Sequence, residues 1–209
     1  MIASEATAPR TQTREEIADL GHLAALDAAL MARVGRGDRD AFTLLVDRHK
    51  DALVGYLARL TGDRDRADDL AQESFLRLFR AAPGYTERGF LRAFLFRIAT
   101  NLVRSEERRE RRLRLLLPFF GRRERSEHEE PAAPEGMLRR ELQSQVAAAL
   151  AALPLRYRAP LVLHEIEGWS YAEIAREMSC REGTVKSRIH RGRRHLKEKL
   201  EPYWSGGTT

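Results

Sequence analysis

The sequence is poor in cysteine, because Cys180 is the only one among 209 residues, and it contains six histidines. One cysteine excludes an intrachain disulfide and a cysteine-based zinc site, and the scattered histidines lack the paired spacing of metal ligands. No apolar run approaches the roughly 20 residues that a membrane-spanning helix needs, and residues 1–14 lack the apolar stretch of a secretory signal. These absences fit a protein of the reducing cytoplasm, for which we expect neither a metal nor another cofactor.

Positive charge is in excess. Lysine and arginine outnumber aspartate and glutamate by 37 to 31, which leaves a net charge of +6. Such an excess indicates a polyanionic partner, either nucleic acid or an anionic membrane surface. Hydrophobic residues make up 43% of the chain and charged residues 33%, a balance typical of a folded globular protein rather than a disordered one. The composition therefore favours a globular protein that binds nucleic acid.

The first half of the chain carries apolar residues at the three- and four-residue spacing of amphipathic helices. The pattern predicts helices over residues 40–60 and 65–80 and a third helix from about residue 90, with a loop over residues 81–89. In the second helix, Phe79 is predicted to face inward with the other apolar residues. The alternation of β-branched residues that is typical of strands is absent, so we predict an all-α fold.

The character of the chain changes between residues 106 and 134, where arginine and glutamate dominate around a short apolar island over residues 113–120. This segment is interpreted as a linker between two small helical domains. The island suits docking on a partner protein better than anchoring to a membrane surface. We therefore divide the chain into a loosely ordered extension over residues 1–25, a helical domain over 26–112, a flexible linker over 113–135, a second helical domain over 136–202 and a tail over 203–209.

Two short helical patterns in the second domain predict a helix-turn-helix. Ser170 and Glu173 have the spacing of a capping box, which begins a helix over residues 171–178. A break of a few residues follows, in which Cys180 is interpreted as part of the core. A longer helix over residues 182–200 completes the motif.

The longer helix carries most of the positive charge of this motif. Residues 181–199 include eight lysines or arginines and only two glutamates. In a helix-turn-helix, the first residues of the second helix meet base edges in the major groove, and later cations meet phosphates. The predicted DNA contacts, to the major groove and to phosphates, are Ser170, Tyr171, Arg181, Glu182, Thr184, Lys186, Ser187, Arg188, Arg191, Arg193 and Arg194.

Motifs in both domains resemble one known family. The second domain contains LPLRYR at residues 153–158, EGWSYAEIA at 167–175 and EGTVKSRIHR at 182–191, which closely resemble the promoter-binding fourth region of extracytoplasmic-function (ECF) sigma factors. In the first domain, DRADDLAQESF at residues 65–75 resembles the polymerase-binding helix of these proteins, and FLFRIATN at 94–101 resembles their promoter-melting helix. The chain thus resembles the ECF subfamily of sigma-70-type RNA polymerase sigma factors over about residues 38–112 and 136–200.

The resemblance implies a protein without enzymatic activity that binds core RNA polymerase and directs promoter recognition, promoter melting and transcription initiation. The first domain would dock on the clamp helices of the largest polymerase subunit, where carboxylates suit a basic partner. An anti-sigma factor is expected as a further partner. The residues that the resemblance assigns to polymerase binding are Asp68, Asp69, Gln72 and Glu73.

The resemblance also assigns each domain a promoter element. The second domain would bind double-stranded DNA at the minus-thirty-five element. The first domain would capture the unpaired strand of the minus-ten element, because exposed bases stack on aromatic rings and phosphates need countercharge. The candidates for this strand capture are Tyr85, Arg88, Phe96, Arg97, Asn101 and Arg104, whereas Phe94 is interpreted as a core residue.

Two other functions remain compatible with parts of the sequence. A one-component transcriptional regulator would share the helix-turn-helix, but its first half should hold a ligand pocket or a receiver domain, usually with strands. An enzyme could bind magnesium at the acidic cluster of residues 63–73 for phosphoryl chemistry. Arg64 and Arg66 lie within that cluster and favour a charged docking surface instead, and no nucleophile–base pair stands out.

Overall fold

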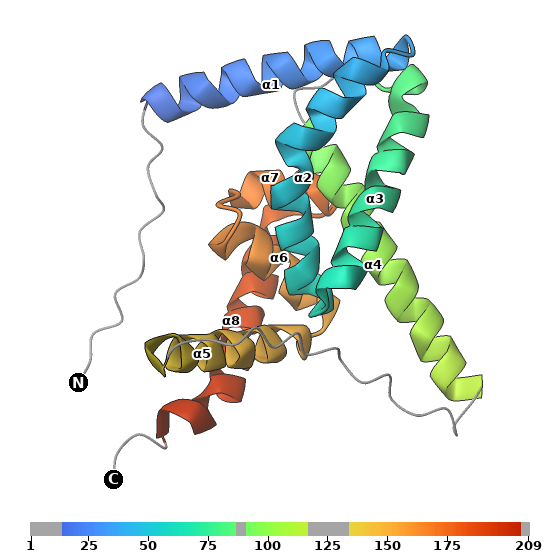
Figure 1. Cartoon of the computed structure of the whole chain (residues 1–209). Coiled ribbons are helices and arrows are strands. Elements are labelled where there is room, and N and C mark those ends of the chain that lie inside the picture. The colour runs from blue at the N-terminus through green and yellow to red at the C-terminus, as the bar shows by residue number, and fades with distance from the viewer. Residues whose placement is uncertain (1–13, 87–90, 117–133, 206–209) are drawn as a thin grey trace.

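The computed structural model describes residues 14–86, 91–116 and 134–205. Within these ranges the chain forms eight α-helices, one short 3-10 helix and no strand (Figure 1). The predicted all-α fold is therefore confirmed. In the part of the chain that the structure describes, no helix is both long and apolar enough to cross a membrane.

Local capping interactions set the helix boundaries of the first half. Asp38 accepts a hydrogen bond from the backbone N–H of Ala41 at 3.0 Å and begins α2. Gly62 ends α2 with a φ of 70°, a left-handed conformation that glycine adopts without steric cost. Asp63 directly follows and caps α3. The first-half elements are α1 (Arg14–Gly35), α2 (Arg39–Thr61), α3 (Arg64–Ala81), the 3-10 helix η1 (Ala82–Gly84) and α4 (Leu91–Leu116).

The N-terminal helix differs from the sequence-based expectation. Helix α1 begins at Arg14, so the predicted loosely ordered extension is wrong for residues 14–25, while residues 1–13 lie outside the described part. Asp27 of α1 is buried against α2, where its two oxygens lie 2.9 Å from Arg48 Nε and 2.9 Å from His49 Nε2. This paired, buried carboxylate fixes α1 to α2 together with the apolar contacts of the same helix.

The second half contains the shorter helices and one long one. Pro134 begins a helix, in keeping with the tolerance of proline in the first helical turn. The last helix continues to Ser205, so the tail begins later than predicted. It packs closely on the helix beneath it at Gly192, where an added Cβ would lie 3.2 Å from the carbonyl oxygen of Tyr157. The elements are α5 (Pro134–Ala151), α6 (Leu155–Glu165), α7 (Tyr171–Glu177) and α8 (Glu182–Ser205).

The two halves pack against each other. Figure 1 shows α6 and α7 beside α2 and α4, and α5, α6 and α7 all contact the helices of the first half. Phe96 of α4 lies in the centre of this contact, with its ring 5.0 Å from that of Tyr56 and 5.2 Å from that of Trp169. Most of the predicted linker, residues 117–133, lies outside the described residues.

Candidate functional site

The predicted helix-turn-helix is confirmed in its local geometry. The backbone N–H of Glu173 donates to Ser170 Oγ at 3.3 Å, and Glu173 Oε2 accepts from the Ser170 N–H at 2.8 Å, so both halves of the capping box are formed. The turn between α7 and α8 uses Ser179 in a left-handed conformation with a φ of 50°. Cys180 is half-buried and packs against the core, as interpreted from the sequence.

The surface of α8 presents the predicted DNA contacts. Thr184 and Arg188 are half-buried, and the Arg188 guanidinium lies 3.9 Å from the sulfur atoms of Met178 and Cys180, which support it from below. Arg188 lies in the second turn of α8, in the part of the second helix that meets base edges in helix-turn-helix proteins. The exposed members of the predicted set on this motif are Ser170, Arg181, Glu182, Lys186, Ser187, Arg191, Arg193 and Arg194.

Three of the cations already have partners within the chain. Arg193 pairs with Glu165 of α6, with Nε and Oε1 2.8 Å apart. Arg194 lies 3.6 Å from Glu198 on its own helix. Hydrogen bonds from Arg191, and then from Arg156, lower the pKa of the Tyr157 hydroxyl below its usual range. These contacts orient the later α8 cations without burying them.

The acidic edge of α3 is accessible. Asp69 and Gln72 are exposed, and Asp68 and Glu73 are half-buried. The Arg77 guanidinium donates to Glu73 Oε1 at 2.7 Å, one turn further along the helix. The four side chains predicted for polymerase binding therefore lie where a partner can reach them.

Apolar side chains extend this edge in a way that sequence reasoning missed. Leu76 is 47% exposed and Phe79 is 36% exposed, so the prediction that Phe79 faces inward was wrong. Its ring instead packs edge-to-face on Phe42, 4.9 Å away. Asp69, Gln72 and Leu76 follow one another at a spacing of three and four residues, which places them on one helix face. From that spacing, an exposed surface with both polar and apolar side chains could have been predicted.

The residues predicted for strand capture separate into two groups by helical phase. Arg97, Asn101 and Arg104 recur every three or four residues and share one side of α4 with Phe94, which was not in the predicted set. The Arg97 guanidinium lies 5.3 Å above the ring of Phe94, which also stacks on Tyr85 at 5.2 Å. Phe94, interpreted as core, is half-buried and packs against the core cluster, and it lies on the same side of α4 as Arg97, Asn101 and Arg104.

The other residues predicted for strand capture differ in their exposure. Arg104 donates to Asn101 Oδ1 at 2.7 Å, and both side chains are exposed. Phe96 is 0% exposed, so its prediction as a DNA contact is wrong for this conformation. It lies two residues from Phe94, about 200° around the helix, and therefore faces the core. Arg88 lies outside the described residues.

Polar side chains accompany Phe96 where α4 meets the second half. Arg92 lies 5.4 Å above the ring of Trp169 and donates to Glu167 Oε2 at 3.1 Å. Burial raises the pKa of Glu167 against the lowering effect of Arg92 and Arg59. Deeper in the contact, Glu177 of α7 is hydrogen-bonded to α4. Both domains thus contribute charged side chains to a largely apolar contact.

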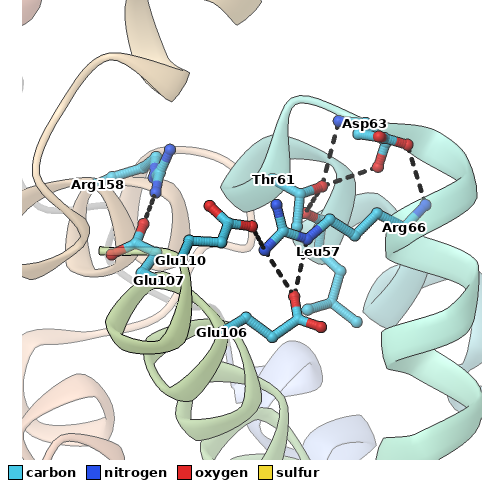
Figure 2. A network of polar contacts seen from close by, with 8 residues as sticks. All are labelled: Leu57, Thr61, Asp63, Arg66, Glu106, Glu107, Glu110 and Arg158. Atoms are coloured by element: carbon cyan, nitrogen blue, oxygen red, sulfur yellow. Dashed lines mark hydrogen bonds and ion pairs between the residues drawn. The ribbon is translucent and has the colours of Figure 1, made fainter. Parts of the chain in front are cut away.

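A network of ion pairs continues along α4 (Figure 2). Arg66 of α3 donates to Glu106 at 2.8 Å and lies 2.7 Å from Glu110. The next residue of α4, Glu107, pairs with the buried Arg158 of α6, which also donates to the carbonyl oxygen of Ala151 at 2.7 Å. Arginines from both halves therefore hold the same helix.

The acidic cluster considered for magnesium has a structural use. Asp63 caps α3 by accepting from the backbone N–H of Arg66. Across residues 14–86, 91–116 and 134–205, no three histidine, cysteine or acidic side chains are grouped so that they could hold a metal ion. The described carboxylates of this cluster act in capping and on the exposed α3 edge.

Comparison with known proteins places both halves in one family. The model of Sigma-70 region 2 matches residues 45–113, and the model of Sigma-70 region 4 matches residues 143–196. Among solved structures, CnrH in complex with the cytosolic domain of CnrY is similar with a TM-score of 0.63 and 28% identity, over 85% of this chain and 98% of that one. The sigma factor RpoE in complex with the anti-sigma factor NepR, from Bartonella quintana, has a TM-score of 0.61 and 26% identity, over 77% of this chain and 96% of that one.

Curated relatives carry the same family name. The ECF RNA polymerase sigma factor SigE of Mycolicibacterium smegmatis is 39% identical over 77% of this chain, which spans 62% of that relative's length. The RNA polymerase sigma-H factor of Pseudomonas aeruginosa is 35% identical over 84% of this chain and 94% of its own. The ECF RNA polymerase sigma-E factor of Haemophilus influenzae is 34% identical over 84% of this chain and 96% of its own length. With region 2 and region 4 both present in order, the chain belongs to the ECF sigma factors of the sigma-70 family.

Proposed function

We propose that this sigma factor binds core RNA polymerase and directs promoter recognition, promoter melting and transcription initiation by dividing the work between its two domains. The observation that carries the proposal is the capped helix-turn-helix with an exposed, cationic α8, joined in one chain to a region 2 domain. Sigma factors are generally non-catalytic initiation factors, so polymerase would perform the chemistry. The site of action would be the cytoplasm, where polymerase transcribes.

Polymerase binding is assigned to the exposed face of α3. Asp69 and Gln72 provide acidic and polar groups, and Leu76 adds an apolar contact one turn further on. Carboxylates facing a basic helix, such as the clamp helices of the largest subunit, would steer association and fix the register. The exposed leucine would contribute the buried apolar centre that stable interfaces need.

Promoter contacts are assigned to two helices. The N-terminal turns of α8 would read the major groove of the minus-thirty-five element, and Arg191, Arg193 and Arg194 would neutralise phosphates. The exposed face of α4 would bind the unpaired minus-ten strand, with Phe94 and Tyr85 as stacking surfaces for bases. This revises the sequence-based set by replacing Phe96 with Phe94.

An anti-sigma factor is proposed as a regulatory partner. The solved structure of RpoE, which is similar over 77% of this chain, contains the anti-sigma factor NepR. Exposed apolar side chains, among them Leu44 and Leu76, are available on the first domain for a protein partner. A partner that covers Leu76 would compete with polymerase for α3.

Reconstitution with bacterial core polymerase tests the proposal. The full chain should co-elute with core polymerase, and the complex should start transcription from a subset of a library of double-stranded promoters. Enrichment of two conserved elements at fixed spacing would identify the sequences that α8 and α4 read. Binding to duplex DNA without polymerase association would instead indicate a one-component regulator.

A further inference from the structure

Glu177, the last residue of α7, is a buried acid between the two domains. Its side chain is 3% exposed, and Oε1 lies 3.0 Å from Thr100 Oγ1 on α4. Thr100 Oγ1 is also 2.9 Å from the hydroxyl of Tyr56 on α2. Among the described residues, the buried Oε2 atom has no hydrogen-bond partner. A carboxyl group in this position is much more stable neutral than ionised.

The charged groups around Glu177 do not neutralise it. Arg97 and Arg104 of α4 attract its negative charge, but within the described chain neither forms an ion pair with it. The nearby groups on the other packed helices have partners other than Glu177. His164 of α6 forms a hydrogen bond with the carbonyl oxygen of Trp169, and Arg188 of α8 contacts the sulfur atoms of Met178 and Cys180. Burial therefore dominates and raises the pKa of Glu177 to about 7.

The contact at Glu177 also holds the two promoter-reading surfaces close together. Because Glu177 touches Thr100, the backbones of Asn101 and Arg181 lie no more than about 30 Å apart, since five residues of at most about 3.6 Å each and two hydrogen-bonded side chains separate them. Elements centred about 25 base pairs apart are separated by about 85 Å of duplex at 3.4 Å per base pair. The closed arrangement in Figure 1 therefore cannot read both elements at once.

The closed arrangement, in which the two domains are in contact, leaves buried polar atoms without hydrogen-bond partners among the described residues. Trp169 is 4% exposed, and its indole N–H has no hydrogen-bond partner in the described part of the chain. With Glu177 Oε2, this leaves two polar atoms buried without partners in the same contact. Water would satisfy both when the domains separate, which lowers the free-energy difference between the closed and open states.

We propose that Glu177 is a proton-controlled latch between the two domains. In its neutral form it stays against Thr100 and holds the chain closed; once ionised, it leaves α4 and releases the domains to span a promoter. This inference rests on the proposed function of the two domains, because only a protein that reads two separated elements needs to open. The latch acts within the free chain and needs no second protein.

The direction of the pH dependence follows from the two states. In the open state Glu177 faces water and titrates near 4.5, whereas in the closed state it titrates near 7. The stabilisation of the closed state is full below the lower value and is lost as pH rises towards the higher one. Between pH 5.5 and 7.5 the equilibrium constant for closing should fall about twentyfold.

The experiment follows the conformation of the full chain without polymerase or DNA. The chain has two tryptophans, so Trp204→Phe leaves Trp169 as the only tryptophan, which is excited selectively at wavelengths where tyrosine does not absorb. Quenching of Trp169 by acrylamide and the radius of gyration from small-angle X-ray scattering are measured between pH 5.5 and 7.5. We expect weak quenching and a compact chain at pH 5.5, and stronger quenching with an expanded chain at pH 7.5.

Three variants make the test specific. Glu177→Gln keeps the hydrogen bond without the charge and should stay closed throughout, whereas Thr100→Val should open at both pH values. Glu198→Gln, which removes the same charge from an exposed position on α8, should behave as the parent does. Far-UV circular dichroism confirms that each variant is helical.

A parent chain with no pH-dependent change, or a Glu177→Gln variant that follows the parent's pH profile, would overturn the latch. These readouts do not involve transcription. A chain that opens with pH but fails in reconstitution contradicts the proposed function alone, and a transcribing chain that does not open with pH contradicts the latch alone.

Discussion

The role assigned to the later cations of α8 can be tested through the salt dependence of promoter binding. Each phosphate contact releases condensed counterions and contributes about 0.9 to the slope of log K against log salt. Arg191, Arg193 and Arg194 should together contribute a slope of about 2.7. Raising the salt from 50 to 200 mM should therefore weaken binding about 40-fold through these three contacts.

Arg194→Ala removes one of these contacts and little else. Its side chain is 61% exposed and meets only Glu198 within the structure's described residues, at 3.6 Å, so folding should be unaffected. The slope should fall by about 0.9, and the loss over the same salt range should shrink to about 12-fold for the remaining two contacts.

The assay is fluorescence anisotropy of the reconstituted holoenzyme on a labelled promoter selected from the library, at a series of potassium chloride concentrations. Lys199→Ala is the matched control, because it removes one exposed positive charge from α8 outside the predicted DNA contacts. Equal slopes for Arg194→Ala and the parent, or an equal decrease for Lys199→Ala, would refute the phosphate assignment.

Further substitutions test the other assignments. Arg188→Ala should weaken binding to the upstream element by about 1–3 kcal/mol and relax selectivity at one base pair, measured by repeating the library selection, while polymerase binding persists. Asp69→Lys combined with Glu73→Lys should reduce co-elution with core polymerase but leave duplex binding by the free chain intact; unchanged co-elution would contradict the α3 docking surface. Ser170→Ala should lower the free energy of unfolding by about 1 kcal/mol through loss of the capping box, measured by urea denaturation. Asp27→Ala should lower it by about 3 kcal/mol, because Arg48 and His49 of α2 lose their buried partner, and a urea midpoint equal to the parent's would contradict that anchoring role.

Local features of the fold were predictable from the sequence because their causes are local. Ser170 and Glu173 are three residues apart, and their side chains satisfy each other's backbone within one turn. The helical phase of α3 likewise places Asp69 and Gln72 outward without reference to the rest of the chain. Phe79 was predicted to face inward because it is apolar, although its helical phase places it on the same face as Gln72 and Leu76.

The placement of Phe96 could not be predicted in the same way. Its burial depends on Trp169, which lies about 70 residues further along the chain and belongs to the other domain. Periodicity identifies a buried helix face but does not identify what covers it. The anchoring of α1 could not be predicted for the same reason, because the burial of Asp27 depends on its contacts with Arg48 and His49 of α2.

Arg66 binds both Glu106 and Glu110, and these ion pairs keep α4 on the first domain past its last buried apolar residue, Val103. A helical residue advances the chain by 1.5 Å, whereas an extended one can advance it by about 3.5 Å. Every turn of α4 that stays wound therefore shortens the reach between the domains by about 7 Å. The maximum distance between the two DNA-reading surfaces is thus set by carboxylates on one helix as well as by the number of residues that connect the domains.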